Sequence, residues 1–159
     1  QSYLELVDKL RRACPDIAIS TDIIVGFPGE TEADFEDTLN LVGRVGYDSA
    51  FTFLYSVRQG TPAAAREDQV PEEVKHERFN RLVEEINSSS AEKNKAYMGR
   101  VEKVLVDGVS RNRDNAYEGR TDSFKLVNFE GPEGLEGQIV PVRITGANTF
   151  SLVGQLAEE

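Results

Sequence analysis

Apolar residues follow one spacing in the first hundred residues and another after Gly99. Over residues 3–13, and again after Thr31, they recur every three or four positions, which predicts two helices. The run 17–25 between them is apolar and rich in β-branched residues, which predicts a strand covered on both faces, as in a parallel sheet. Residues 50–57 alternate aromatic with smaller side chains and predict a second strand. This order of elements is typical of an α/β fold with parallel strands.

A polar connection and one long helix complete the first part. The connection covers residues 58–70, and Pro71 suits the first turn of a helix. Apolar positions continue at helical spacing to about Tyr97, with serines 88–90 as a weak point and a candidate hinge. Two strands cannot form a stable parallel sheet, so the α/β domain is expected to be incomplete. The chain also opens at Gln1, without an initiator methionine, directly into a helix pattern, so we expect a cut inside a longer protein.

After Gly99 the pattern changes to short strands separated by clusters of Gly, Asn, Asp and Pro. The expected strands are 100–109, 116–121, 125–129, 138–145 and 149–155. Five strands in about 60 residues are typical of a small closed or nearly closed β-barrel of the OB-like kind. The expected fold class is therefore α/β plus all-β, with an α/β domain over residues 1–70, a connecting helix over 71–97 and a β-barrel over 98–159.

Composition fits a globular protein and restricts its chemistry. Of 159 residues, 39% are hydrophobic and 29% charged, and no apolar stretch reaches the roughly 20 residues that a membrane helix needs. The one cysteine, Cys14, cannot form a disulfide within the chain, which favours a reducing cytoplasm. With one histidine, His76, it cannot build a thiolate or imidazole metal site. We interpret both as ordinary structural residues.

Charge is distributed unevenly along the chain. The net charge of −10 at pH 7 argues against a general nucleic-acid binder, which is normally basic. Residues 1–93 carry 10 Lys and Arg against 18 Asp and Glu, whereas residues 94–159 carry 8 against 10. The second part is thus nearly neutral, and its clustered cations are expected to form a local positive patch, which suits phosphate contact: Arg111, Arg113, Arg120 and Lys125.

Aromatic and amide residues are interleaved with these cations. Tyr117, Asn128 and Phe129 suit base stacking and hydrogen bonding beside phosphate contacts. Ordinary barrel packing with solvent-facing cations explains the same composition, so the pattern alone leaves both interpretations open.

The densest motif runs from Thr21 to Thr31, with the sequence TDIIVGFPGET. It places a glycine turn at the carboxyl end of a buried strand, the edge at which α/β proteins bind ligands. Gly26 and Gly29 would let a ligand approach the backbone, and the start of the next helix would offer N–H donors. A plain connecting turn is the alternative, because glycine turns are common and neither a phosphate-binding P-loop nor a GxGxxG motif is present.

Polar residues near this edge extend the candidate site. Asp22 lies in an apolar run and is expected to be buried, where its carboxylate would need a partner. Ser56 and Arg58 follow the second strand at the same edge, and a guanidinium there can hold a carboxylate with two hydrogen bonds. The alternatives are a backbone-bonded strand end for Asp22 and a surface ion pair for Arg58. The charge run over residues 72–78 is most simply a solvated helix face.

Taken together, these motifs resemble the rear half of the radical S-adenosylmethionine methylthiotransferases. The resemblance rests on residues 21–31, 51–63 and 68–71, and in the tail on residues 119–121, 127–129 and 137–145, which resemble the TRAM domain of that family. It covers essentially the whole chain and is closest to the MiaB-type members, which modify tRNA.

The resemblance implies a fold, a reaction and cofactors. It implies a partial radical-SAM, TIM-like barrel followed by an OB-like TRAM β-barrel, and conversion of N(6)-dimethylallyladenosine, next to the tRNA anticodon, into its 2-methylthio derivative. The full-length enzymes use S-adenosylmethionine and two 4Fe-4S clusters, whose cysteines lie in the front part of the family's chain. This fragment is therefore expected to hold neither cluster nor any catalytic residue, and to be inactive alone. The implied partners are the tRNA anticodon stem-loop and the missing N-terminal part of the same chain.

The resemblance also assigns residues by position. Those expected on one side of the S-adenosylmethionine site are Asp22, Gly26, Phe27, Pro28, Gly29, Glu30, Ser56 and Arg58. Two alternatives remain: the same chemistry on tRNA carrying a threonylcarbamoyl group or on a ribosomal protein, and a non-catalytic RNA-binding module. Residues 21–24 and 119–121 favour a tRNA substrate over a protein substrate.

Overall fold

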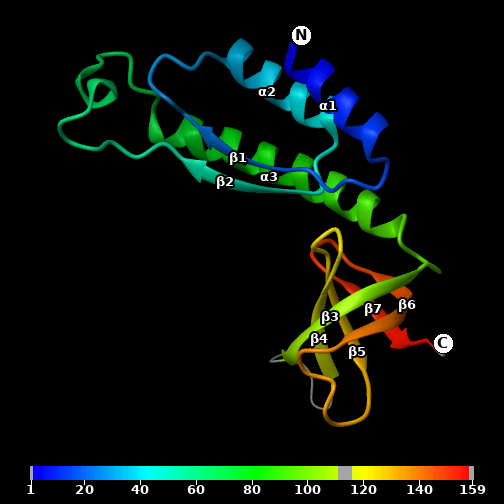
Figure 1. Cartoon of the computed structure of the whole chain (residues 1–159). Coiled ribbons are helices and arrows are strands. Elements are labelled where there is room, and N and C mark those ends of the chain that lie inside the picture. The colour runs from blue at the N-terminus through cyan, green and yellow to red at the C-terminus, as the bar shows by residue number, and fades with distance from the viewer. Residues whose placement is uncertain (1, 111–115, 158–159) are drawn as a thin grey trace. The chain divides into compact units, whose positions relative to one another are not determined.

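The computed structural model describes residues 2–110 and 116–157 (Figure 1). The chain divides into two compact units, the first made of residues 1–7 and 19–89 and the second of residues 8–18 and 90–159. Each unit has its own cluster of buried apolar side chains. Each is therefore stabilised by burial within itself.

Helices occur where the apolar spacing predicts them. They are α1 (Ser2–Ala13), α2 (Glu32–Val45) and α3 (Glu72–Lys95). A short 3-10 helix, η1 (Pro62–Ala65), lies within the predicted connection and was not expected. A capping box opens α2, because the Asp34 amide donates to the Thr31 hydroxyl over 3.2 Å while the Thr31 amide donates to the Asp34 carboxylate over 2.9 Å. α2 ends at Gly46, whose left-handed backbone suits glycine and whose amide donates to the Val42 carbonyl.

The first unit contains a parallel pair of strands, which confirms the α/β expectation. β1 (Ser20–Val25) pairs with β2 (Ser49–Leu54) in a register that runs from Ser20 opposite Ser49 to Val25 opposite Leu54. β1 begins three residues later than the apolar run because the Ile19 amide donates to the Asp48 carboxylate instead of entering a ladder. The described part of this unit holds a two-stranded sheet and is not itself a barrel.

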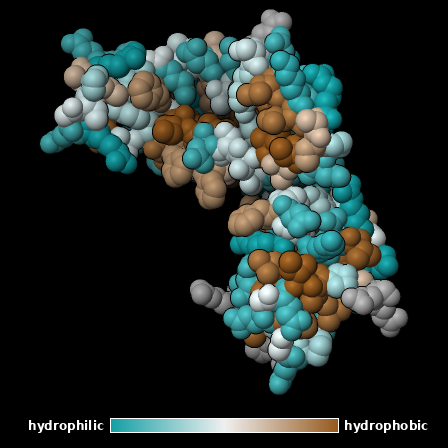
Figure 2. All heavy atoms as spheres, viewed as in Figure 1, coloured by the Kyte–Doolittle hydropathy of each residue, from teal (hydrophilic) through white to brown (hydrophobic). Residues whose placement is uncertain are grey.

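Only one face of this sheet is covered by the described residues. Val25 packs with α1, α2 and α3 in one core, which includes Phe35 and Leu82, both fully buried. On the other face, Ile24, Phe51 and Phe53 are 56%, 67% and 50% exposed. The prediction that β1 is covered on both faces is therefore wrong for this part of the chain. Figure 2 shows apolar side chains at the surface of this unit.

The long helix α3 begins one residue after Pro71 and runs unbroken through serines 88–90. The Ser89 hydroxyl donates to the Tyr47 carbonyl over 2.9 Å, and the boundary between the two units falls directly after Ser89. A hinge at serines 88–90 stays a prediction. Leu82 and Ile86 carry the buried stripe of α3 into the core of the first unit. No helix within the described residues is long and apolar enough to cross a membrane.

The second unit is a closed five-stranded barrel, as predicted. Its strands are β3 (Val101–Val109), β4 (Ala116–Thr121), β5 (Leu126–Glu130), β6 (Ile139–Ala147) and β7 (Leu152–Leu156). They follow the order β3-β4-β5-β7-β6, in which β5 and β7 are parallel and the other described pairs antiparallel. Inward side chains such as Val104, Val127 and Leu152 are fully buried. Alternation along the strands leaves the opposite side chains on the outer surface.

Candidate functional site

The ends of β1 and β2 meet, as expected for neighbouring parallel strands. The Tyr55 amide donates to the Val25 carbonyl over 2.8 Å, just beyond the paired residues. The Phe27 ring then packs edge-on against the Tyr55 ring, with centroids 5.3 Å apart. The Gly26–Glu30 turn and the start of the loop after β2 therefore form one continuous edge.

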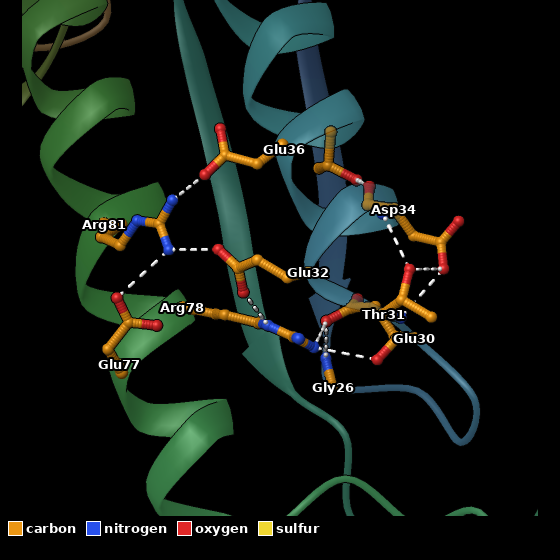
Figure 3. Close-up of polar contacts among 10 residues, drawn as sticks. Gly26, Glu30, Thr31, Glu32, Asp34, Glu36, Glu77, Arg78 and Arg81 are labelled. Carbon is orange, nitrogen blue, oxygen red and sulfur yellow. Dashed lines mark hydrogen bonds and ion pairs between the residues drawn. The ribbon is translucent and has the colours of Figure 1, made fainter.

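The turn is braced from α3 by one buried arginine (Figure 3). Arg78 has a side chain only 6% exposed, and its Nη1 donates to the Glu30 carbonyl over 3.0 Å and to the Glu30 carboxylate over 2.9 Å. The same Glu30 oxygen accepts the Gly26 amide over 3.1 Å. The Arg78 Nε donates to Glu32 over 3.1 Å. One guanidinium thus fixes both ends of the turn and the first residue of α2.

A buried lysine from the same helix face holds the end of β2. Lys75 is 2% exposed, and its Nζ donates to the Tyr55 carbonyl over 3.3 Å and to the Glu72 carboxylate over 2.6 Å. The ammonium also lies 5.6 Å from the centroid of the Tyr55 ring. Hydrogen bonds and an ion pair compensate for removing this charge from water.

The backbone donors of the turn are used within the chain. The Gly29 amide donates to the Asp68 carbonyl over 2.8 Å, the Glu30 amide donates to the Phe27 carbonyl over 2.9 Å, and Gly26 donates to Glu30. These three amides are therefore not free to donate to a ligand. The donors that the sequence predicts lie further along, at the start of α2, where the Asp34 amide already donates to the Thr31 hydroxyl. A ligand at this edge would have to be bound by groups other than these three amides.

Side chains of the protein itself fill the space beside the two glycines of the turn, so this space is not open to a ligand. A Cβ at Gly26 would lie 2.3 Å from the Lys75 Cγ, and a Cβ at Gly29 would lie 2.4 Å from the Arg66 Nη2. Arg66 is itself paired with Asp68, whose carboxyl pKa is lowered mainly by this hydrogen bond. The missing Cβ atoms therefore serve the packing of the turn against the residues that follow β2.

Exposed ion pairs join the start of α2 to α3 beside this brace. Arg81 pairs with Glu32 over 2.6 Å, with Glu77 over 3.2 Å and with Glu36. Hydrogen bonds from Arg81, and then from Arg78, lower the pKa of the Glu32 carboxyl. The Thr31 hydroxyl lowers the pKa of Asp34 in the capping box. Negative charge in the first turn of α2 is thereby maintained where the helix dipole favours it.

The predicted residues fall into two groups along this edge. Pro28 is buried, Glu30 is nearly buried in the Arg78 brace, and Phe27 is 46% exposed beside Tyr55. Asp22, Ser56 and Arg58 are exposed. The expectation of a buried Asp22 is wrong, because alternation along β1 turns its side chain to the uncovered face of the sheet. Whether these residues contact a cofactor stays a prediction.

Sequence reasoning missed the two cations that hold the site. The charge run of α3 was interpreted as a solvated face, but Lys75 and Arg78 are buried. A signal was available, because positions 75, 78, 82 and 86 are spaced by three or four residues and therefore share one helix face. The apolar members of that stripe, Leu82 and Ile86, mark the face that enters the core.

An exposed aromatic side chain lies beside a cation on the outer surface of the barrel. Phe124 lies in the turn between β4 and β5 and is 76% exposed. The Arg120 guanidinium lies 4.9 Å from the centroid of its ring, and the Arg120 Nε is 3.5 Å from the Asp107 carboxylate. Leu105 lies opposite Arg120 on β4 and opposite Ile139 on β6. These outward residues form a row across three strands.

Residues 95–157 match the family model described as the TRAM domain. This part of the chain is a TRAM domain.

The whole chain is similar to curated proteins named tRNA-2-methylthio-N(6)-dimethylallyladenosine synthase. One from Clostridium botulinum (strain Hall) is 61% identical over 155 residues, 98% of this chain and 34% of the relative. One from Clostridium novyi (strain NT) is 58% identical over 156 residues, which are again 98% of this chain and 34% of the relative. One from Clostridium perfringens (strain SM101) is 54% identical over 156 residues, which are 98% of this chain and 35% of the relative.

The chain spans about a third of the length of these curated relatives and corresponds to their C-terminal part. The TRAM domain therefore ends the matched region, and the α/β unit precedes it. This similarity bears out the resemblance to MiaB-type tRNA methylthiotransferases.

The four cations predicted to contact RNA do not form one exposed patch among the described residues. Arg111 and Arg113 lie outside the described residues. Arg120 is on the surface beside Phe124, whereas Lys125 is only 9% exposed, with its ammonium 5.8 Å from the centroid of the Tyr97 ring. Burial leaves little of Lys125 available to a phosphate.

The aromatic residues first considered for base stacking belong to the core of the TRAM domain. Tyr117 is 8% exposed and Phe129 is 2% exposed, and their rings stack on each other with centroids 6.0 Å apart. The stacking interpretation of these two residues is therefore wrong. Phe124 and Phe150 are exposed instead, and patterning does not single them out because one Phe in a turn has no periodic signal.

Proposed function

We propose that this chain is the C-terminal part of a tRNA methylthiotransferase that converts N(6)-dimethylallyladenosine beside the anticodon into its 2-methylthio derivative. The observation that carries the proposal is identity of 54–61% with proteins named for this reaction, over nearly every residue of the chain. The TRAM domain supports it, because a small barrel with exposed cationic and aromatic groups suits RNA. The reaction then takes place in the cytoplasm, where tRNA is modified.

The α/β unit would contribute part of a radical-SAM barrel. Ile24, Phe51 and Phe53 form an uncovered apolar face on a sheet of two strands, and such a face needs further strands or a ligand against it. The relatives are about three times as long as the chain, so their preceding residues are available to extend the sheet. The exposed Asp22 would then point into the interior of the completed barrel, beside the turn at Gly26–Glu30.

The chain's own residues do not fit iron–sulfur clusters. Such clusters are held by several Cys thiolates, and the chain has only Cys14, which is exposed. Within residues 2–110 and 116–157, no three His, Cys, Asp or Glu side chains are grouped to hold a metal ion. We therefore assign both clusters to the preceding part of the protein.

We infer that S-adenosylmethionine packs against the strand-end edge. Phe27 and Tyr55 provide apolar rings there, and the turn is rigid because Arg78 and Lys75 hold it from α3. Since the amides of Gly26, Gly29 and Glu30 are already bonded, we infer that this edge packs against the cofactor rather than donating to it from those groups. Asp22, Ser56 and Arg58 remain the exposed polar candidates for contacting it.

The test is the nucleoside composition of tRNA in cells. The complete gene that encodes this chain is introduced into a bacterial strain that lacks its own methylthiotransferases, and digested tRNA is examined by mass spectrometry. We expect 2-methylthio-N(6)-dimethylallyladenosine to appear. The same spectra distinguish the alternatives, because a methylthiolated threonylcarbamoyladenosine or a methylthiolated ribosomal protein would identify a related enzyme. If neither tRNA nor ribosomal proteins changed, the proposed function would be contradicted and the alternative, a non-catalytic RNA-binding module, would be favoured.

A further inference from the structure

The β4–β5 turn of the TRAM domain holds its aromatic side chain in an unusual conformation. Phe124 has φ of 64°, and among the described residues it is the one non-glycine with positive φ. A bulky side chain is disfavoured there, because the left-handed region brings its Cβ close to the backbone. A turn needing only this backbone shape would be better served by Gly or Asn. The choice of Phe, with 76% of its surface exposed, therefore requires a reason outside the folding of the turn.

Hydrogen bonds around Thr121 hold this turn closed. The Phe124 amide donates to the Thr121 carbonyl over 2.9 Å, and the Thr121 amide donates to the Lys125 carbonyl over 3.0 Å. The Lys125 amide donates to the Thr121 hydroxyl over 3.0 Å. Ser123 bonds to the same hydroxyl and to the Tyr97 hydroxyl, over 3.0 and 2.7 Å. The ring of Phe124 is thus presented by a turn that is ordered before any ligand arrives.

A guanidinium and a shallow groove flank the ring. Arg120 lies 4.9 Å from the ring centroid and is oriented by Asp107. The groove beside them has a volume of about 430 Å³, and its lining includes Lys103, Leu105, Asp107, Arg120, Phe124 and Ile139. Leu105 and Ile139 are 46% and 67% exposed and form an apolar floor across β3 and β6. Figure 2 shows apolar side chains on the surface of the barrel.

We propose that Phe124 and Arg120 form a stacking platform for one unpaired RNA base, and that the groove beside them receives it. The inference rests on the proposed function, which makes RNA the partner of the TRAM domain. A planar base stacks on both an aromatic ring and a guanidinium. The cations Lys103 and Arg120 are offset by Asp107 and Asp122 in the same groove, so it favours an uncharged, flat group over a phosphate.

The platform differs from the basic patch that composition indicates. Phosphate contacts give affinity that falls with salt and is insensitive to the base, whereas a stacked base contributes through its π-face. Loss of the Phe124 ring should therefore weaken binding at every salt concentration by the same factor. Loss of a phosphate-contacting cation would change the slope of affinity against salt.

The test measures binding of anticodon stem-loop RNA to the 159-residue chain, with 2-aminopurine at successive loop positions as a fluorescent base. We expect Phe124→Ala to raise Kd about 5- to 100-fold, because base–aromatic stacking contributes on that scale. It should also restore the fluorescence that stacking quenches at one loop position. Phe124→Trp should retain both binding and quenching, since its ring also stacks.

Two controls separate stacking from folding and from general exposure of a ring. Phe150→Ala removes another ring of the same unit that is also 76% exposed, and it should leave Kd within about twofold. Phe124→Asn tolerates the left-handed backbone, so it should keep or raise the melting temperature while binding RNA as weakly as Phe124→Ala.

The outcomes distinguish this inference from the proposed function. If the unaltered chain fails to bind the stem-loop, both the RNA role of the TRAM domain and the platform are overturned. If it binds and Phe124→Ala binds equally well, or if Phe124→Ala changes the salt slope instead of the affinity at all salts, only the platform is overturned.

Discussion

Replacing Arg78 with Met is expected to lower the free energy of unfolding by about 3–5 kcal/mol, because breaking a buried ion pair leaves the partner charge without compensation. Arg78 is 6% exposed and Glu30, its partner, is 13% exposed in the side chain. The change also removes a donor from the Glu30 carbonyl and from Glu32. Urea denaturation of the chain, followed by circular dichroism, measures the loss.

Arg81→Met is the matched control for Arg78→Met. Arg81 lies on α3, as Arg78 does, and contacts Glu32, Glu36 and Glu77. Its side chain is 34% exposed, however, and its partners are more exposed still. Its loss should cost less than about 1 kcal/mol, as surface pairs do. Adding Glu30→Gln to Arg78→Met should recover part of the loss, because the uncompensated carboxylate is then removed. If Arg78→Met and Arg81→Met lowered the free energy of unfolding equally, the claim that buried Arg78 holds the Gly26–Glu30 turn would be refuted.

Replacing Gly26 with Ala is expected to have the second large effect, lowering the free energy of unfolding by about 2–5 kcal/mol. Part of the cost is conformational, since φ at Gly26 is +77° and a Cβ is disfavoured there by about 1–2 kcal/mol. The remainder is steric, because the new Cβ would lie 2.3 Å from the Cγ of buried Lys75, and overpacking costs about 1–3 kcal/mol. The free energy of unfolding is again measured in urea.

Gly60→Ala isolates the conformational part of this cost. Gly60 has φ of +84°, close to that of Gly26, but a Cβ there would meet no atom within 4 Å. Its substitution should therefore cost only about 1–2 kcal/mol. The difference between the two variants is the steric cost of displacing Lys75. If both alanines cost the same, Lys75 moves freely and does not hold the end of β2.

Periodic burial made most of the fold predictable. The barrel strands alternate strictly enough that β4 was expected over its observed bounds, Ala116 to Thr121. The helices were located because Phe35, Val42, Leu82 and Ile86 recur at helical spacing and enter the core. β2 was expected to continue to Val57, but pairing ends at Leu54 because β1 gives way to the Gly26 turn at Val25.

The candidate site was less predictable because its geometry depends on contacts distant in sequence. Arg78 is 48 residues from Glu30, and nothing local in a run of charged residues shows that one of them is buried. The turn at Gly26–Glu30 is located by its glycines, but the partners of the Gly29 and Gly26 amides, the Asp68 carbonyl and the Glu30 side chain, are brought there only by folding. Phe124 was missed because exposure of a turn residue has no signature in patterning.

Under the proposed function, the TRAM domain delivers tRNA to chemistry performed elsewhere in the protein. The most direct measurement is kcat and KM for tRNA methylthiolation by the complete protein with and without residues 95–157, after thermal melting shows that the shortened protein is folded. We predict that KM for tRNA rises at least about tenfold without the TRAM domain, as loss of several RNA contacts requires, while kcat at saturating tRNA changes little. An unchanged KM would contradict the account.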